Sequence, residues 1–214
     1  GQLAAGLAHE LRNPLTAVRT LVEAARSRGA AAQLDGRDLE VVEEEISRLD
    51  STLQSFLDYA RPPVLERRPV DVRDVIQRTV QLVNARAEIQ SVHIETSLPA
   101  DPLVVSADSE QLRQVLLNLL LNALDSLGSG GRITVSAAAE PATGQVLLQI
   151  ADTGPGIPAA VRDTLFDPFV SSKPSGTGLG LTICRRIVEN HGGTIAAENS
   201  PTGGAVFSVK LPSP

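Results

Sequence analysis

The chain has 214 residues and a net charge of −6 at pH 7, and its basic residues form no clustered stripe, which argues against a nucleic-acid-binding surface. With 42% apolar residues but only four Phe, one Tyr and no Trp, the core must consist of aliphatic side chains. The single cysteine, Cys184, excludes an internal disulfide and suits a reducing compartment. Because Ile183 and Ile187 lie beside it, we expect a packed rather than a reactive thiol.

Membrane-spanning and signal segments are not evident in the sequence. No apolar run approaches the roughly 20 residues that a membrane span requires, and no signal peptide is present. The first residues already belong to a leucine pattern and lack a helix cap. We therefore expect a cytoplasmic fragment of a longer protein, whose missing upstream region is the only part that could reach a membrane.

The first predicted element is an amphipathic helix over residues 3–22. Its polar side carries His9 and Asn13, with Glu10 at the flank next to the imidazole. Pro14 removes the helical hydrogen bond to the carbonyl of Glu10, so we expect a kink beside the histidine. The apolar side chains fall in one stripe roughly 120° wide: Leu3, Leu7, Leu11, Leu15, Val18 and Val22.

A second helix is predicted from about Asp38 to Tyr59, after a Gly- and Ala-rich turn that ends in Asp35-Gly36. It has its own apolar stripe, so the two helices form a hairpin that cannot hide both stripes alone. Each exposed Leu or Ile forfeits about 1.5 to 3 kcal/mol, and two copies packed as a four-helix bundle would bury them. We therefore predict a homodimer. The sequence leaves open the alternative that the stripes cover the C-terminal part of the same chain.

Arg61-Pro62-Pro63 cannot continue a helix, so the predicted domains are 1–61, the helical hairpin, and 62–214. Strands and helices mixed without regular βαβ alternation predict an α/β sandwich, one sheet covered by helices on a single face. Asp71 and Asp108 are the expected helix caps. We expect strands at 64–70, 92–97, 103–106, 131–138, 146–151, 194–198 and 205–211, with helices at 71–87, 108–127 and 178–191.

The helix that follows Asp108 carries two asparagines among leucines. Asn118 and Asn122 stand four residues apart and project from one face, with Asp125 three residues further on. Asparagine is a poor choice inside a helix because its side chain competes for backbone hydrogen bonds. A purely structural role, in which a buried asparagine bonds to the neighbouring backbone, would explain one of these two residues better than it explains both. Their carbonyl oxygens suit Mg²⁺, a hard cation usually bound through substrate phosphates as well.

A glycine-containing turn follows the predicted strand at 146–151. Asp152 is anchored by the sheet, while Gly154 and Gly156 let the backbone turn and approach a flat ring, with Ile157 next in the chain. A carboxylate here could accept a charge-assisted hydrogen bond from an exocyclic amine, worth about 1.5 to 3 kcal/mol. Taken alone, this pattern is often only a turn.

A second glycine-rich stretch, GTGLGL at 176–181, precedes the last predicted helix. It neither follows a strand nor lies in a βαβ unit, so the dinucleotide-binding interpretation lacks its context. The free N–H groups at a helix start make an anion site instead. The candidate residues are Thr177, Gly178, Leu179 and Gly180.

Just before this stretch, Phe166 and Phe169 place two of the four phenylalanines in one loop. We expect their rings to anchor a lid over residues 170–177, which is rich in Ser, Pro and Gly. Lys173 on this lid is the candidate cation for phosphates; a solvated lysine on a loop is an equal alternative.

Taken together, these stretches resemble the boxes of two-component sensor histidine kinases, in the family's order and over nearly the whole chain. HELRNP at 9–14 resembles the phosphoacceptor box, and NLLLNA at 118–123 the asparagine box. DTGPGI at 152–157 resembles the first glycine box, while FDPF at 166–169 and GTGLGL resemble the phenylalanine box and the second glycine box. The resemblance implies an α/β sandwich ATP-binding domain with ATP and Mg²⁺ as cofactors.

The resemblance also implies the roles of single residues. His9 would accept the phosphoryl group, Asn118 and Asn122 would carry Mg²⁺ and phosphate contacts, and Asp152 would bind the adenine amino group. Where many relatives have a lysine three residues after the second asparagine, this chain has Asp125. Another residue would then have to supply positive charge to the phosphates.

The predicted activity is histidine autophosphorylation followed by phosphotransfer to an aspartate on a response-regulator receiver domain. An imidazole of ordinary pKa, about 6.5, is mostly neutral at pH 7, so His9 can attack through one ring nitrogen while Glu10 holds the other N–H. Relatives with Glu-x-x-Asn also dephosphorylate the partner, and Glu10 and Asn13 fit that pattern. The alternatives are an ATPase like gyrase or the heat-shock chaperones, in which ATP drives conformational change, and an inactive dimerising scaffold.

Overall fold

The computed structural model describes residues 2–27, 33–60, 64–171 and 178–213, except for the side chains of 2–5, 9, 10, 51, 55, 58 and 59. The chain forms two compact units, residues 1–63 with 167–179 and residues 64–166 with 180–214. The predicted domain boundary at 61/62 stays a prediction, because residues 61–63 lie outside the described residues. Within the described ranges, no helix is long and apolar enough to cross a membrane.

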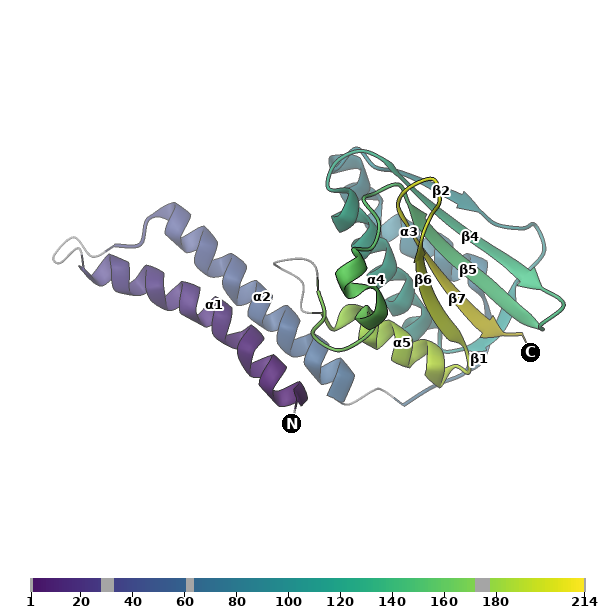
Figure 1. Cartoon of the computed structure of the whole chain (residues 1–214), viewed down its shortest axis with the longest axis horizontal. Coiled ribbons are helices and arrows are strands. Elements are labelled where there is room, and N and C mark those ends of the chain that lie inside the picture. Colours follow the sequence, from purple (N-terminus) through teal and green to yellow (C-terminus); the bar gives the residue numbers. More distant parts are fainter. Residues whose placement is uncertain (1, 28–32, 61–63, 172–177, 214) are drawn as a thin grey trace. The chain divides into compact units, whose positions relative to one another are not determined.

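The first unit contains the two predicted helices, α1 (Gln2–Ser27) and α2 (Gly36–Ala60) (Figure 1). Helix α1 continues through Pro14, and the predicted kink there stays a prediction. Helix α2 begins at a reciprocal cap: the Asp38 N–H donates to Asp35 Oδ1 at 2.8 Å, and the Asp35 N–H donates to Asp38 Oδ2 at 3.3 Å. Such a capping box satisfies two free backbone donors, so the predicted turn at Asp35 also starts the helix.

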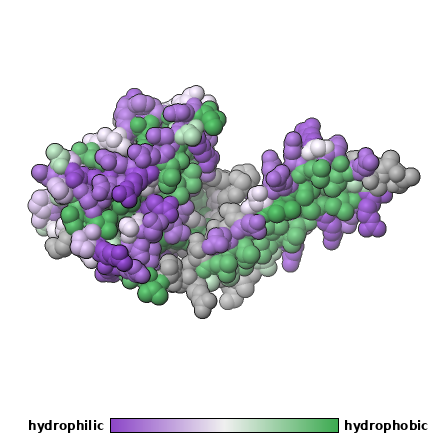
Figure 2. Space-filling view, turned by 180° about the vertical axis from the view of Figure 1, so that it is seen from behind, coloured by the Kyte–Doolittle hydropathy of each residue, from purple (hydrophilic) through white to green (hydrophobic). Residues whose placement is uncertain are grey.

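The helical hairpin leaves large apolar side chains exposed on both helices. Figure 2 shows them as a continuous hydrophobic band along the hairpin. Leu15, for example, keeps 56% of its surface exposed and Leu39 keeps 53%. Among the hairpin side chains that the structure describes, the exposed large apolar ones are Leu15, Val22, Leu39, Ile46, Leu53 and Leu57. A single hairpin therefore does not bury its own stripes.

The second unit is built on a five-stranded mixed sheet with the order β2-β4-β5-β7-β6. Among the described strands of this sheet, β2 and β4 pair in parallel, while the pairs β4–β5, β5–β7 and β6–β7 are antiparallel. The strands are β2 (His93–Ser97), β4 (Arg132–Glu140), β5 (Gln145–Asp152), β6 (Thr194–Asn199) and β7 (Ala205–Pro212).

A separate two-stranded sheet pairs β1 (Arg68–Asp71) with β3 (Val104–Ala107). The strand predicted over 64–70 is therefore wrong in its first half. Residues before Arg68 bond elsewhere: the Glu66 N–H donates to Asp108 Oδ2 at 3.2 Å, and Arg67 donates to the carbonyl of Asn190.

Three helices cover one face of the large sheet: α3 (Val72–Ile89), α4 (Ser109–Leu127) and α5 (Gly180–Asn190) (Figure 1). Asp71 and Asp108 cap α3 and α4 as predicted, each accepting hydrogen bonds from backbone N–H groups of the first turn. Alternate residues of β5 are buried under the helices and alternate residues are half-exposed. A short 3₁₀ helix, η2 (Ala159–Thr164), was not predicted. A helical hairpin followed by an α/β sandwich is confirmed.

Candidate functional site

A polar stripe runs along α4. Asn118 and Asn122 are both half-buried on one face, and Ser126 continues the same spacing of four residues. A Cβ placed on Gly180, the first residue of α5, would lie 4.0 Å from Asn118 Cγ, and one on Gly154 would lie 3.0 Å from Ser126 Oγ. The stripe is about 12 Å long at 1.5 Å per residue. It therefore connects the first turn of α5 to the loop after β5.

The side chain of Asn118 contacts Cys184 of α5. The thiol is fully buried, its Sγ lies 3.8 Å from the carbonyl oxygen of Val115, and it shares a hydrogen bond with the Asn118 side chain. Burial raises the pKa of the Cys184 thiol to about 12, outweighing the opposite effect of the Asn118 hydrogen bond. The predicted packed thiol is confirmed.

Asp152, the last residue of β5, presents one carboxylate oxygen to the backbone and keeps the other free. Asp152 is buried, with only 5% of its surface exposed. The N–H groups of Gly154 and Ala205 donate to Oδ1 at 2.8 and 3.3 Å. Among the residues that the structure describes, no hydrogen bond reaches Oδ2. Oδ2 can therefore accept a hydrogen bond from a ligand's amino group.

The loop from Gly154 to Ile157 is held by the β6–β7 hairpin. The Ile157 N–H donates to Asn199 Oδ1 at 2.6 Å, and Asn199 Nδ2 donates to the Ile157 carbonyl at 3.0 Å. Gly156 has φ +79°, and its backbone approaches Asn199 so closely that a Cβ there would lie 2.8 Å from Oδ1. Asn199 was missed from the sequence, and so was Ser126, although the spacing of four residues on α4 indicates Ser126.

The predicted lid, residues 170–177, is flanked by two residues that bond to each other. The Phe169 N–H donates to the Gly178 carbonyl at 3.1 Å, and both residues have positive φ, +63° and +64°. A Cβ on Gly178 would lie 2.5 Å from the Phe169 backbone, so this position requires glycine. Leu179 is fully buried. Lys173 and Thr177 lie outside the described residues.

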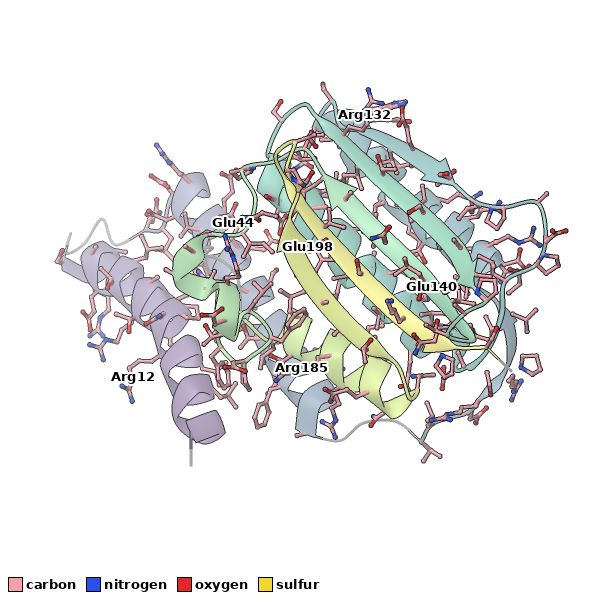
Figure 3. The ribbon with its side chains drawn as sticks, turned by 45° about the vertical axis from the view of Figure 1, so that its right-hand side comes forward. Arg12, Glu44, Arg132, Glu140, Arg185 and Glu198 are labelled. Atoms are coloured by element: carbon pink, nitrogen blue, oxygen red, sulfur yellow. The ribbon has the colours of Figure 1, made fainter. Side chains whose placement is uncertain are left out.

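The other predicted anchor, Phe166, is half-buried and lies under a guanidinium group. The Cζ atom of Arg185, on α5 (Figure 3), is 5.9 Å from the centre of the Phe166 ring. This is the distance of a weak cation–π contact.

Asp125 has a positively charged partner on a neighbouring helix. Its carboxylate forms an ion pair with Arg86 of α3. Asp125 lies one helical turn beyond Asn122 on α4. The departure from the family pattern at position 125 is thus accompanied by a cation from a neighbouring helix.

On the polar side of α1, the described side chains are exposed as predicted. Asn13 and Thr16 are exposed, and Thr16 Oγ1 donates to the carbonyl of Arg12 at 2.8 Å, one turn back. His9 and Glu10 belong to the helix, and their side chains lie outside the described set.

Comparison with known proteins finds two family models that match this chain. Residues 1–63 match the His Kinase A (phospho-acceptor) domain, and residues 107–214 match the histidine kinase-, DNA gyrase B- and HSP90-like ATPase domain. The sensor histidine kinase ZraS of Klebsiella oxytoca is 39% identical over 212 residues, which cover 99% of this chain and 46% of ZraS. The chain thus spans about half the length of such relatives.

Solved structures of histidine kinases have the same fold. ThkA in complex with the response regulator protein TrrA has a TM-score of 0.84 and 28% identity, over all of this chain and 62% of ThkA. Full-length ShkA in complex with AMPPNP has a TM-score of 0.70 and 30% identity, over 99% of this chain and 45% of ShkA. With both family models matched in this order, the chain belongs to the sensor histidine kinase family.

Proposed function

We propose that this chain binds ATP with Mg²⁺, transfers the γ-phosphoryl group to His9, and passes it to an aspartate on the receiver domain of a response regulator. The observation that carries the proposal is the stripe Asn118-Asn122-Ser126, which leads from the first turn of α5 to Asp152 with its unbonded Oδ2. ShkA was solved with AMPPNP and ThkA with a response regulator, and this chain is similar to both.

The adenine end of the nucleotide lies at Asp152 in this proposal. Oδ2 accepts a hydrogen bond from the exocyclic amine, while Oδ1 stays bonded to the backbone. The loop containing Gly154, Gly156 and Ile157 faces the base. Thr177, Gly178, Leu179 and Gly180, with Lys173, belong to the phosphate end.

Asn118 and Asn122 fit Mg²⁺ because both side chains offer a neutral oxygen ligand from one face of α4. In the described part of the chain, no group of three His, Cys, Asp or Glu residues could hold a metal alone. The ion would therefore be shared with the phosphates, and it would neutralise their charge. Arg86 balances the negative charge of Asp125, with which it is paired.

His9 is the nucleophile. One nitrogen of its neutral imidazole attacks the γ-phosphorus, the bond from phosphorus to the bridging oxygen of ADP breaks, and ADP leaves. Glu10 holds the N–H on the other ring nitrogen, which raises the basicity of the attacking one. Asn13 orients the water that removes the phosphoryl group from the partner.

The protein acts as a homodimer in this proposal. The exposed apolar faces of α1 and α2 would become the core of a four-helix bundle between two copies. Fully burying each such side chain is worth about 1.5 to 3 kcal/mol, which explains why these positions are apolar.

The test is incorporation of label from γ-labelled ATP. The wild-type protein should become labelled with acid-labile, base-stable phosphate, and His9→Gln should abolish the label. Thr20→Ala, on the same polar side of α1, is the matched control and should keep it. Label that survives in His9→Gln refutes the assignment of the nucleophile. Release of free phosphate without labelled protein would indicate the ATPase alternative.

A further inference from the structure

The side chain of Asn199 binds a backbone segment far away in the sequence. Asn199 is the last residue of β6 and follows Glu198, which Figure 3 labels on that strand. Its amide accepts from the Ile157 N–H at 2.6 Å and donates to the Ile157 carbonyl at 3.0 Å. The contact imitates the hydrogen bonding of a neighbouring β-strand, with a side-chain amide in place of a peptide group.

Ile157 needs this partner because it belongs to no strand or helix. The residue is only 7% exposed, and a buried peptide group without hydrogen bonds is costly. Within the described residues, Asn199 is the only group that bonds to the Ile157 backbone. The neighbouring hydroxyls of Ser200 and Thr202 bond to each other, 2.8 Å apart.

Both ends of the Asp152–Ile157 loop are held by one pair of opposed residues. Asn199 and Ala205 face each other in the β6–β7 ladder. The Ala205 N–H donates to Asp152 Oδ1 at 3.3 Å, and Asn199 binds Ile157. Loss of the Asn199 amide would release only the Ile157 end, because Asp152 remains in β5.

We propose that Asn199 is a positioning residue that holds the Gly154–Ile157 loop in the shape that receives the nucleotide base. The inference rests on the proposed adenine site at Asp152. In this inference Asn199 contributes to the affinity for the base and not to the affinity for the phosphates. The phosphates would be bound by the first turn of α5 and the α4 asparagines.

The experiment measures binding of ATP and of inorganic tripolyphosphate, which lacks a base, to the full 214-residue chain. Asn199→Ala removes both hydrogen bonds and should weaken ATP binding about tenfold. Binding of tripolyphosphate should change less than twofold, and the autophosphorylation rate at saturating ATP should stay near that of the wild type. Thr202→Ala, in the adjacent turn, is the matched control and should behave as the wild type.

Asn199→Asp keeps the side-chain volume, so it replaces the alanine variant in this experiment if the alanine variant does not fold. Its carboxylate can accept from the Ile157 N–H but cannot donate to the carbonyl, so ATP binding should again weaken while tripolyphosphate binding holds. Equal losses for both ligands, or ATP binding within twofold of the wild type, would overturn the inference. If Asp152→Asn weakens ATP binding and neither Asn199 variant does, only this inference fails. If none of the three does, the adenine site itself is wrong.

Discussion

Replacing Asp152 with asparagine exchanges one carboxylate oxygen for an NH₂ group. The change separates the two roles of the carboxylate, which are to bond to the backbone through Oδ1 and to bond to the base through Oδ2. The N–H groups of Gly154 and Ala205 require an acceptor at the Oδ1 position, so the amide oxygen must take that place. The amide NH₂ group then occupies the position of Oδ2, where it faces another donor, the exocyclic amine of adenine. A charge-assisted hydrogen bond worth about 1.5 to 3 kcal/mol is lost, which corresponds to a weakening of ATP binding by about 10- to 150-fold.

The stability of the fold should respond differently. Because Asp152→Asn keeps both backbone hydrogen bonds, its free energy of unfolding should stay within about 1 kcal/mol of the wild type. Asp152→Ala leaves the buried N–H of Ala205 and the half-buried N–H of Gly154 without an acceptor, and it should lose about 2 kcal/mol or more. Isothermal titration with ATP and denaturant unfolding measure the two effects, with the exposed Asp163→Asn on η2 as control. ATP affinity within twofold of the wild type in Asp152→Asn would refute the assignment of Oδ2 to the base.

Four further outcomes are expected. The Cys184 thiol, with its pKa raised to about 12 by burial, should resist iodoacetamide at pH 8 until the protein is unfolded by denaturant. The hydrogen bond from Arg73 lowers the pKa of Asp71, so its stabilising effect should be present above the unfolded value near 3.9 and lost as pH falls through the lower folded value. Asp71→Asn should therefore flatten the pH dependence of unfolding in acid. Leu53→Glu should convert the dimer to a monomer in sedimentation, and an unchanged dimer would contradict the bundle. Asn13→Ala should spare autophosphorylation and slow removal of phosphate from the regulator, and equal losses in both assays would refute its separate role.

The elements that position the site were largely predictable because local chemistry determines them. Asp71 and Asp108 precede apolar helical patterns and cap α3 and α4, and two asparagines four residues apart necessarily share a helix face. Asp152 follows a strand pattern of alternating burial, which places its carboxylate at the end of β5.

The contacts that hold these residues in place were not predictable, since they join segments distant in sequence. Asn199 lies 42 residues from Ile157, and their contact depends on the order of strands in the sheet and on where β6 ends. Nothing local distinguishes Asn199 from an ordinary residue at a strand end. The segment before Arg68 was misassigned for the same reason, because its hydrogen bonds go to Asp108, the cap of α4, and to Asn190, the last residue of α5, and not to a strand.

Position 125 illustrates how a departure from a family motif should be judged. An acidic residue near a phosphate site is unfavourable when considered alone, because like charges repel. In the folded chain, Asp125 is paired with Arg86, which lies 39 residues earlier on α3, so the pair is neutral. Both side chains are partly exposed, so the pair adds little to stability, and its consequence for the site is that Asp125 adds no net negative charge. The relevant comparison between relatives is therefore the charge present at a point in space, whichever helix supplies it.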